Sequence, residues 1–451
     1  MQSERPILMS YSHMFQTAIH TMITITRKSV YTVRYSGLQG LYRKARKVLF
    51  PAPIYQQSWS KTYASEALTL AQWLDCTPED LRRSRALTSM NQGFIDIKTV
   101  NWYLPHFDHA YYGGIYTILR FAAHLAKNYN VKSSFIILGD ANAPDAATYI
   151  ERISTVFAEL KESHAVVIRS DIDLPGVPSS DVCIATLWST AYYVLKFNQT
   201  RRKFYFIQDF EPMFYPAGST SAQVETSYRF GFYGITNTIT LKQHYEQDYG
   251  GDAVSFNPCV DTAIFNPSTM VNKRHQNYRV FFYARPHHWR NGFELGAIAL
   301  RKLKERLGAK VEIIAAGQLW DPEEYGLSGI VENLGLLSYH QTADIYRSCD
   351  AGLVMMFTRH PSYLPFELMA SGCLVITNIN SATSWLLKDG ENCLLTLPTA
   401  SCIADTIARG LQNEDLRQSI VNSALNDIKT HFSDWDAQID HVYQYMCRPE
   451  I

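Results

Sequence analysis

Short apolar runs alternate with longer amphipathic segments over most of this chain. Runs typical of buried strands occur at residues 94–102, 135–139, 165–168, 182–186, 204–207, 235–239 and 254–256. Between them, residues 115–128 and 188–197 place apolar side chains at helical spacing, which predicts helices. Strands that alternate with helices form βαβ units around a parallel sheet. We therefore expect residues 91–267 to fold as one Rossmann-like α/β domain.

The same pattern starts again after residues 257–267, whose asparagines and prolines are typical of an interdomain linker. Further strands are predicted at 278–283, 311–317, 351–356 and 374–377, and helices at 290–307, 340–348, 366–371, 401–431 and 435–446. Residues 268–451 are thus expected to form a second Rossmann-like domain, with the last helix able to pack back on the first domain.

The first 90 residues differ from the rest, and we expect them to form a basic helical extension. From Arg5 to Ser65 there is no Asp or Glu. Apolar side chains recur at helical spacing over residues 38–49, and Arg43, Lys44 and Lys47 are among the basic residues on the other face. A basic amphipathic helix suits an anionic membrane surface, which residues 1–50 would then contact. The alternative is a solvated helix packed on the body of the protein.

Length, charge and cysteine content exclude several classes of protein. A chain of 451 residues is too long for one core, which agrees with two domains plus an extension. The formal net charge is +0, so nothing in the bulk electrostatics indicates a nucleic-acid partner. Eight cysteines without C-x-x-C spacing argue against a zinc site and suit a reducing compartment. Without a long apolar run or a signal peptide, the expected location is the cytoplasm, with peripheral membrane contact as an option.

Two turns of the first predicted domain carry candidate chemistry. Gly113 and Gly114 precede a helix, where glycines let a ligand approach the backbone. Asp209 and Glu211 follow the strand at 204–207, and open α/β sheets bind ligands at the carboxyl ends of their strands. The two carboxylates are candidates to orient or deprotonate an acceptor hydroxyl. The alternative is a pair of turn-capping residues.

In the second domain, two arginines lie at the turn between a strand and a long helix. Arg285 follows the strand at 278–283, and Arg290 stands at the start of the helix. Arginine pairs at such turns clamp phosphate groups through several parallel hydrogen bonds. We predict a diphosphate site here. Ordinary surface salt bridges are the alternative.

Residues 360–377 predict an irregular loop, a short helix and a buried strand. Unpaired amides at a helix start favour an anion, and the carboxylate of Glu367, one turn inside, suits a sugar hydroxyl. This combination predicts a nucleotide-sugar site, and the alternative is an ordinary loop with a surface glutamate. The residues assigned to the donor here are Ser362, Tyr363, Leu364, Pro365, Phe366 and Glu367.

Several of these segments resemble motifs of the retaining GT-B glycosyltransferases in the sucrose-synthase-like family. Residues 257–267 are similar to the linker phrase of that family, and residues 283–292 to its donor motif. Residues 360–372 resemble the second half of its Glu-x7-Glu motif, with Glu367 as the second Glu and Arg359 at the place of the first. Residues 207–218 and 360–365 also resemble the WsaF-type rhamnosyltransferases of bacterial surface-glycan assembly.

The resemblance implies a GT-B fold, with two Rossmann-like domains facing a cleft behind a helical N-terminal extension. The first domain would bind a glycan or lipid-linked glycan acceptor, at Gly113 and Gly114 among others. The second would bind a dTDP-sugar donor, dTDP-L-rhamnose in these relatives. No cofactor or metal is expected, because Arg285 and Arg290 would neutralise the leaving diphosphate. Two alternatives stay open: a non-catalytic nucleotide- or glycan-binding protein, and a sugar-nucleotide epimerase.

Overall fold

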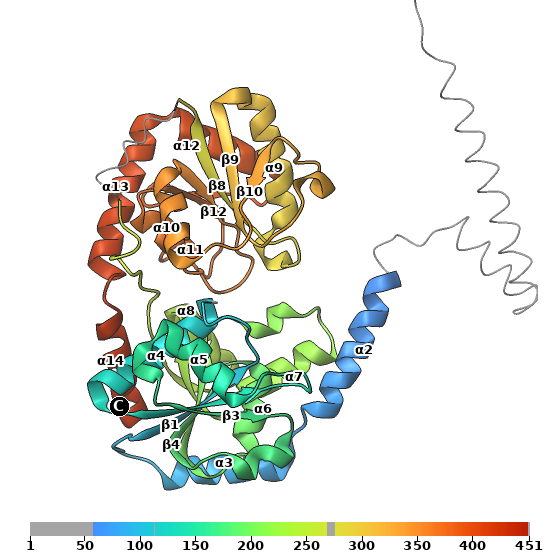
Figure 1. Cartoon of the computed structure of the whole chain (residues 1–451), viewed down its shortest axis with the longest axis vertical. Helices are drawn as coiled ribbons and strands as arrows, with labels where there is room; N and C mark the ends of the chain where they lie inside the picture. Colours follow the sequence, from blue (N-terminus) through green and yellow to red (C-terminus); the bar gives the residue numbers. More distant parts are fainter. Residues whose placement is uncertain (1–56, 112, 268–275, 450–451) are drawn as a thin grey trace, which may run out of the picture. The chain divides into compact units, whose positions relative to one another are not determined.

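The structure is a computed structural model that describes residues 57–111, 113–267 and 276–449 (Figure 1). It divides into two units, Met1–Gln72 and Trp73–Ile451. The described part of the first unit is helix α2 (Gln57–Trp73), which runs one residue into the second. The basic segment at residues 1–50, with the amphipathic helix predicted at 38–49, lies outside the described residues.

Helix α3 (Pro78–Met90) lies near the start of the second unit, and it begins with a capping box and a proline in its first turn. The side chain of Thr77 accepts a hydrogen bond from the amide of Asp80, and the side chain of Asp80 accepts one from the amide of Thr77. Pro78 occupies the first turn, where its missing N–H costs nothing. The helical N-terminal region predicted from the sequence is therefore present in the described residues.

The first sheet has seven parallel strands in the order β3-β2-β1-β4-β5-β6-β7. Its strand order reverses between β1 and β4, and such switch points are where open α/β sheets bind ligands. The strands are β1 (Thr99–Pro105), β2 (Lys132–Leu138), β3 (His164–Ile168), β4 (Ser180–Ala185), β5 (Thr200–Ile207), β6 (Tyr233–Thr236) and β7 (Asp252–Ser255).

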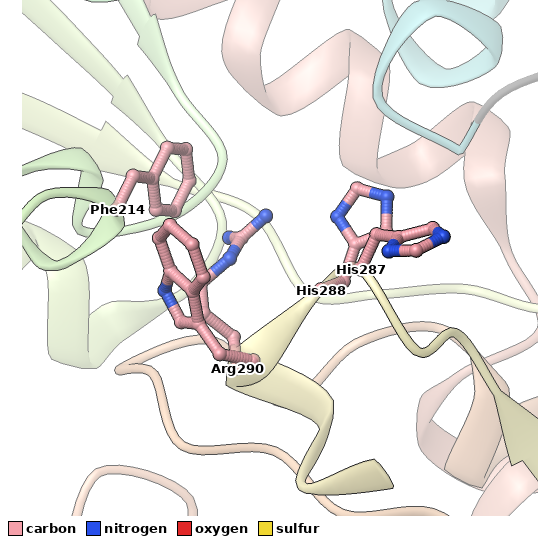
Figure 2. Close-up of a pocket in the computed structure, with 5 residues that line it drawn as sticks. Phe214, His287, His288 and Arg290 are labelled. Atoms are coloured by element: carbon pink, nitrogen blue, oxygen red, sulfur yellow. The ribbon is translucent and has the colours of Figure 1, made fainter. Parts of the chain in front are cut away.

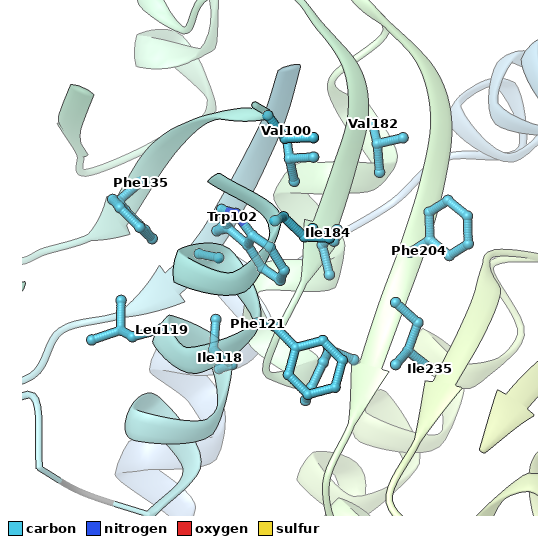
Figure 3. Packing of buried hydrophobic residues seen from close by; sticks show 14 of the residues in the cluster. Val100, Trp102, Ile118, Leu119, Phe121, Phe135, Val182, Ile184, Phe204 and Ile235 are labelled. Atoms are coloured by element: carbon cyan, nitrogen blue, oxygen red, sulfur yellow. The ribbon is translucent and has the colours of Figure 1, made fainter. Parts of the chain in front are cut away.

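Helices cover this sheet and complete its core. They are α4 (Gly113–Tyr129), α5 (Ala146–Val156), α6 (Trp188–Lys196), α7 (Ser219–Tyr228) and α8 (Ile239–Tyr249). Figure 3 shows Phe121 of α4 among buried residues of the strands, including Trp102 and Phe204. The Phe121 and Phe206 rings meet edge to face, with centroids 5.0 Å apart. Aromatic pairs of this kind hold helix and sheet in one packed core.

The strand predicted at residues 94–102 is the clearest difference from the sequence analysis. The strand begins only at Thr99 and continues to Pro105, and its five central residues are all buried. Ile95 and Ile97 are buried as well, but they lie in the irregular segment before the strand. An alternating pattern indicates a half-buried strand, whereas a parallel sheet covered on both faces buries every position.

The second sheet has six parallel strands in the order β10-β9-β8-β11-β12-β13, with its switch point between β8 and β11. The strands are β8 (Tyr278–Ala284), β9 (Val311–Gly317), β10 (Val331–Asn333), β11 (Ala351–Leu353), β12 (Leu374–Asn378) and β13 (Leu394–Thr396). The prediction for 351–356 was too long, and β13 was not predicted at all. Both strands are short, which leaves little periodicity in the sequence.

The helices of the second sheet are α9 (Phe293–Leu307), α10 (Tyr339–Ser348), α11 (Leu364–Ala370), α12 (Ala400–Gln412) and α13 (Glu414–His431). Residues 401–431 were predicted as one helical stretch, but Asn413 divides it. The Asn413 side chain accepts a hydrogen bond from the amide of Leu416 and so caps the start of α13. In α9, Gly296 lets the helix approach the sheet, because a Cβ atom there would lie 2.5 Å from the Phe282 ring.

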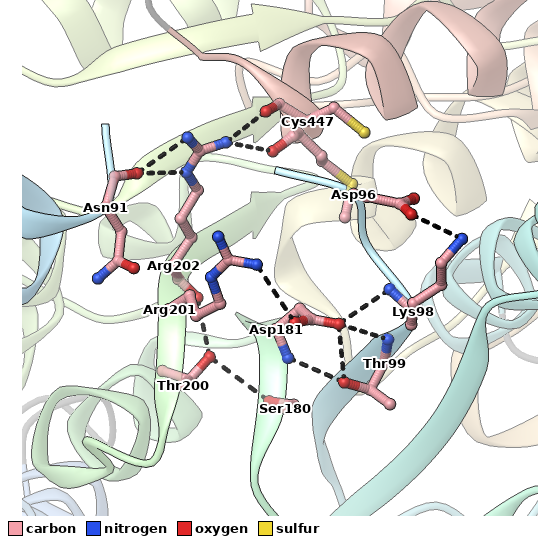
Figure 4. Close-up of polar contacts among 11 residues, drawn as sticks. Asn91, Asp96, Lys98, Thr99, Ser180, Asp181, Thr200, Arg201, Arg202 and Cys447 are labelled. Carbon is pink, nitrogen blue, oxygen red and sulfur yellow. Dashed lines mark hydrogen bonds and ion pairs between the residues drawn. The ribbon is translucent and has the colours of Figure 1, made fainter. Parts of the chain in front are cut away.

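The last helix, α14 (Trp435–Cys447), follows the second sheet in sequence but packs into the core of the first. The fully buried Arg202 of β5 donates hydrogen bonds to the carbonyls of Met446 and Cys447 at the end of α14 (Figure 4). The same guanidinium donates to the carbonyls of Asn91 and Gly93 after α3. One buried cation thus ties the segment after α3 and the end of α14 to an interior strand of the first sheet.

Candidate functional site

Three turns at strand ends supply the predicted site residues, and side-chain contacts at these turns join the two sheets. The turns follow β5, β8 and β11 and span residues 208–211, 285–292 and 358–367. Arg290 of the second turn forms an ion pair with Asp209 of the first, with 3.1 Å between Nη1 and Oδ2. Tyr363 of the third accepts a hydrogen bond from Asn237, at the end of β6, over 2.8 Å. Arg290 and Tyr363, two candidate residues of the second sheet, therefore contact residues at the carboxyl ends of strands in the first.

Asp209 is the predicted carboxylate that meets an arginine. Its side chain is 14% exposed, and it accepts hydrogen bonds from the amide of Phe210 and the hydroxyl of Thr358 as well as from Arg290. Burial raises the pKa of Asp209 to about 6, and the positive charge of Arg290 limits the rise. A carboxyl group that titrates this close to neutral pH suits proton transfer.

Glu211 is turned in another direction by the short 3₁₀ helix that it opens (Glu211–Phe214). Its side chain is buried, and Oε2 accepts a hydrogen bond from the amide of Trp188 at the start of α6 over 2.6 Å. The hydroxyl of Tyr205 bonds the same carboxyl group. Burial raises the pKa of Glu211 to about 8. The structure does not bring Glu211 to Arg290 as it does Asp209, and a role for Glu211 in catalysis stays a prediction.

Arg290 lines a cavity of about 140 Å³ together with Phe214, His287, His288 and Trp289 (Figure 2). Its guanidinium lies over the Phe214 ring, 3.7 Å from the centroid, so the cation is held between an aromatic face and the Asp209 carboxylate. Trp289 is 53% exposed at this cavity. The site therefore presents a positive charge beside aromatic surface.

Arg285, the second predicted arginine, is held by two neutral groups. Its Nη1 donates to the hydroxyl of Tyr283 over 3.2 Å, and its Nη2 contacts Nε2 of His288. Burial and the two nearby arginines lower the pKa of His288 to about 4, so the imidazole is neutral and accepts the hydrogen bond. Neither a phenol nor a neutral imidazole offsets the charge of Arg285. The Arg285 guanidinium is therefore held in position while its charge is not neutralised. A residue that binds phosphate needs both properties.

The helix start predicted to bind phosphate offers fewer amides than the sequence suggested. Helix α11 begins at Leu364 rather than Phe366, and Pro365 in its first turn has no N–H. The amide of Leu364 points to the hydroxyl of Ser362 at 3.5 Å. Ser362 itself has a φ of +62°, in the left-handed region that serine rarely adopts. A phosphate role for the amides of residues 364–366 stays a prediction.

Tyr363 and the glycine pair are connected to the first sheet by hydrogen bonds near the Asp209 turn. The buried hydroxyl of Tyr363 also accepts a hydrogen bond from Thr117 of α4 over 3.2 Å. Gly113 and Gly114 open that helix, and the carbonyl of Gly114 accepts a hydrogen bond from the side chain of Gln208 over 3.1 Å. A Cβ atom on Gly113 would meet nothing within 4 Å. The glycine turn thus adjoins the Asp209 turn and has open space beside it.

Glu367 is a buried carboxyl group with little of its bonding capacity in use. It is 8% exposed, and the hydroxyl of Tyr339 donates to Oε1 over a long 3.3 Å. Burial raises the pKa of Glu367 to about 7, and the Tyr339 hydrogen bond opposes the rise. A carboxylate accepts up to about four hydrogen bonds, so this group can bind a further hydroxyl.

Sequence reasoning missed the residues around Arg290 that shape the cavity. Phe214 and the run His287–His288–Trp289 were given no role, because loop residues carry no periodicity. For His287, His288 and Trp289, the available signal was their position between two arginines after a strand. Thr358, which bonds Asp209, was missed as well. It lies in an irregular segment, and only the fold brings it to a turn of the first sheet.

The described residues contain neither a metal-binding cluster nor a membrane-spanning helix. In residues 57–111, 113–267 and 276–449, no group of three or more His, Cys, Asp or Glu side chains could hold a metal ion. Within the same part of the chain, no helix combines the length and apolarity needed to cross a membrane.

Solved structures show that two Rossmann-like halves in this arrangement form the GT-B fold. Sucrose-phosphate synthase from Thermosynechococcus elongatus superposes with a TM-score of 0.60 at 14% identity, covering 77% of this chain and 98% of that one. Anabaena HepE in complex with UDP-glucose gives 0.59 at 16%, with the same coverage. WaaG, a glycosyltransferase involved in lipopolysaccharide biosynthesis, gives 0.55 at 13%, covering 77% and 99%. At these identities the likeness shows the fold alone.

Sequence comparison then gives the family. Residues 99–241 match the N-terminal domain of WsaF, and residues 278–408 match its C-terminal domain. The chain belongs to the WsaF family. It is also 41% identical over 377 residues to the O-antigen biosynthesis protein RfbC of Myxococcus xanthus. That match covers 83% of this chain but 29% of the relative, so the chain spans less than a third of that protein's length.

Proposed function

We propose that this protein is a retaining glycosyltransferase that moves L-rhamnose from dTDP-L-rhamnose to a glycan or lipid-linked glycan in surface polysaccharide biosynthesis. The WsaF family and the relative named for O-antigen biosynthesis support the class of reaction. The observation that carries the proposal is the meeting of Arg290 with Asp209 at the ends of both sheets. This contact supports the proposal because the Arg290 guanidinium can bind a phosphate and the neighbouring Asp209 carboxylate can take a proton.

In this mechanism the bond between the sugar C1 and the diphosphate breaks, and its electrons leave with the nucleoside diphosphate. Arg285 and Arg290 stabilise the negative charge that develops on the leaving group. The acceptor oxygen bonds to C1 on the face that the diphosphate leaves. Its proton passes to Asp209, whose pKa of about 6 leaves it mostly ionised at neutral pH and still a competent base.

Glu367 would hold a hydroxyl of the nucleotide's own sugar ring. Its buried position and its spare lone pairs fit that role. The acceptor would approach over Gly113, where the space is open, and beside the cavity that Trp289 lines. Because the leaving group is neutralised by arginines in this proposal, transfer should persist in EDTA.

The donor is tested by thermal-shift titration with dTDP, UDP and GDP, followed by transfer assays with dTDP-L-rhamnose and UDP-glucose. A ligand that binds only the folded protein raises its melting temperature as concentration passes Kd. We expect dTDP to stabilise the protein most. Stabilisation by UDP and not by dTDP would reject the rhamnosyl donor and leave the fold-level class standing.

Two alternative functions remain to be tested against the proposed one. Arg359 stands where the related enzymes have an acidic residue, so a non-catalytic nucleotide-binding protein is one alternative. It predicts nucleotide binding without turnover for any acceptor. An epimerase on the same fold predicts conversion of the free nucleotide-sugar with no acceptor present. Product analysis of dTDP-L-rhamnose incubated with and without a glycan acceptor separates these two from a transferase.

We further propose that residues 1–50 bring the enzyme to an anionic membrane surface. The motive is the absence of acidic residues from Arg5 to Ser65. Sedimentation of the full chain with anionic vesicles should exceed that with neutral vesicles and should weaken with salt, which screens the attraction. Equal sedimentation with both vesicle types would reject the proposal.

A further inference from the structure

His360, in the loop between β11 and α11, is a buried histidine with one unpaired ring nitrogen. It is 8% exposed, and its Nδ1 accepts a hydrogen bond from the amide of Ser362 over 3.0 Å. A neutral imidazole that accepts at Nδ1 carries its proton on Nε2. Nε2 of His360 has no hydrogen-bond partner within the described structure. The ring therefore carries a buried N–H donor that the protein leaves unused.

The loop around His360 is held in place by hydrogen bonds and by a strained backbone conformation. The unpaired donor is therefore not explained by loose packing. Ser362 holds its amide toward His360 while its backbone is in the left-handed region, with φ at +62°. The carbonyl of Thr358 accepts a hydrogen bond from the Asn380 side chain over 2.6 Å, which anchors the loop on its other side. A buried donor without a partner also costs stability, and such groups in native proteins call for an explanation.

His360 lies beside the cation and carboxylate that join the two sheets. Thr358, two residues earlier, has its hydroxyl near the His360 backbone and bonds the Asp209 side chain. Burial, and then the charge of Arg290, lower the pKa of His360 to about 3, so the ring is neutral at physiological pH. It therefore adds a hydrogen-bond donor to this region without adding charge.

We propose that His360 is a substrate-binding residue whose Nε2–H donates to an oxygen of the bound nucleotide-sugar. This inference rests on the proposed function and adds to it a residue with no assigned role. Both a diphosphate oxygen and a sugar oxygen accept such a hydrogen bond. A neutral donor differs from Arg285 and Arg290, because it contributes geometry rather than charge neutralisation.

Two substitutions separate a binding role from a structural one. In His360→Asn, the side-chain oxygen can take the place of Nδ1 and accept the Ser362 amide, but the outer N–H is lost. In His360→Gln, the amide N–H reaches the place of Nε2, but the Ser362 contact is lost. The ligand is whichever of dTDP-L-rhamnose and UDP-glucose the wild-type protein binds, and the matching nucleoside diphosphate is titrated in parallel.

We expect His360→Asn to melt near the wild-type temperature and to bind the nucleotide-sugar about ten- to a hundredfold more weakly, with His360→Gln closer to wild type. If the nucleotide-sugar and the nucleoside diphosphate lose affinity equally, the oxygen that accepts the Nε2–H hydrogen bond belongs to the diphosphate. If only the nucleotide-sugar loses affinity, that oxygen belongs to the transferred sugar. Wild-type affinity and turnover in His360→Asn would overturn the inference. The inference also fails if both variants bind weakly and both melt at a lower temperature, because partial unfolding would then explain the weak binding. If wild type binds no nucleotide-sugar, the proposed function itself fails.

Discussion

The turn after β5 and the helix after β11 each bury a glutamate, but the protein uses the two carboxyl groups differently. Glu211 accepts a hydrogen bond from the amide of Trp188 over 2.6 Å and another from Tyr205. Glu367 receives one from Tyr339, over 3.3 Å. Burial raises the pKa of both, to about 8 and about 7. A raised pKa therefore does not distinguish the two groups, whereas the number of hydrogen bonds that each carboxyl group accepts does.

The difference extends to the basic residues. Arg202 in β5 is buried and donates to backbone carbonyls at the ends of α3 and α14, which is a structural use. Arg285 is held by a phenol and a neutral imidazole, which leave its charge for a ligand. Arg202 is thus bonded to backbone carbonyls, whereas Arg285 and Arg290 are bonded to side chains. The following experiments test that distinction.

The largest effect is expected from Arg290→Ala. Removing a preorganised charge donor at a leaving group costs about 10²-fold or more in turnover. Arg290 also lowers the pKa of Asp209, so its loss should raise that pKa and move the rising limb of the pH–rate profile to higher pH. Steady-state kinetics across pH measure both effects.

The matched control for that experiment is Arg306→Ala. Arg306 lies on α9, is half exposed, and pairs with Asp405 away from the strand ends. Surface ion pairs contribute little, so this variant should keep wild-type kinetics. An Arg290→Ala enzyme with unchanged turnover would show that the ion pair with Asp209 only joins the two halves.

The next effect tests the two glutamates directly. Glu367→Ala should weaken nucleotide binding by about ten- to a hundredfold, because a buried sugar hydroxyl loses its acceptor. Glu367→Gln keeps one acceptor oxygen and should lose less. Glu211→Gln should leave nucleotide affinity unchanged. Calorimetric titration of the nucleoside diphosphate into all three variants measures these affinities. An equal loss of affinity in Glu211→Gln and Glu367→Gln would show that the two glutamates do not differ in ligand binding.

How far the sequence could anticipate this site depends on the kind of contact involved. Apolar runs located most of the strands of both sheets. Strand ends then indicated Asp209 and Arg285, and the loop and short helix at residues 360–371 indicated Glu367. Asp209 and Glu211 were assigned one role because they lie two residues apart after a strand. Their separate directions come from the 3₁₀ turn at Glu211 and from the amide of Trp188, a partner 23 positions away. No local pattern contains that information.

Contacts between distant segments explain the other omissions. A donor role for Tyr363 stays a prediction, and the contact of its hydroxyl with Thr117, 246 positions earlier, was not anticipated from the sequence. His360 stood in the predicted loop without a role, since its unpaired nitrogen becomes visible only when the fold buries it. Residue type and spacing predicted which segments matter. Which side of each segment meets a ligand depends on tertiary packing.

A smaller effect concerns stability against pH. The pKa of Glu211 is raised on folding, so the folded state holds its proton at pH values where the unfolded state has released it. Its contribution to stability is complete below about pH 4.5 and is lost as pH rises toward about 8. Glu211→Gln cannot titrate and should melt at a temperature that depends less on pH.

Melting curves from pH 5 to pH 8 measure that slope in the wild type and in Glu211→Gln. Asp209 and Glu367 also have raised pKa values, so some slope of the same sign should remain in the variant. Identical slopes in both proteins would mean that Glu211 is ionised in the folded state throughout, and that its hydrogen bonds outweigh its burial.

The smallest effect is expected at Trp289, the exposed aromatic residue of the Arg290 cavity. It is 53% exposed, so the tryptophan offers apolar surface beside Phe214. Aromatic contacts contribute about 0.5–1.5 kcal/mol beyond their buried area, or about two- to tenfold in affinity. If an acceptor sugar stacks there, Trp289→Ala should raise the acceptor KM by that factor and leave nucleotide affinity unchanged. Trp289→Phe keeps an aromatic face and should recover most of the loss. A variant with weaker nucleotide binding and an unchanged acceptor KM would assign Trp289 to the donor instead, and the acceptor would then have to approach over Gly113 alone.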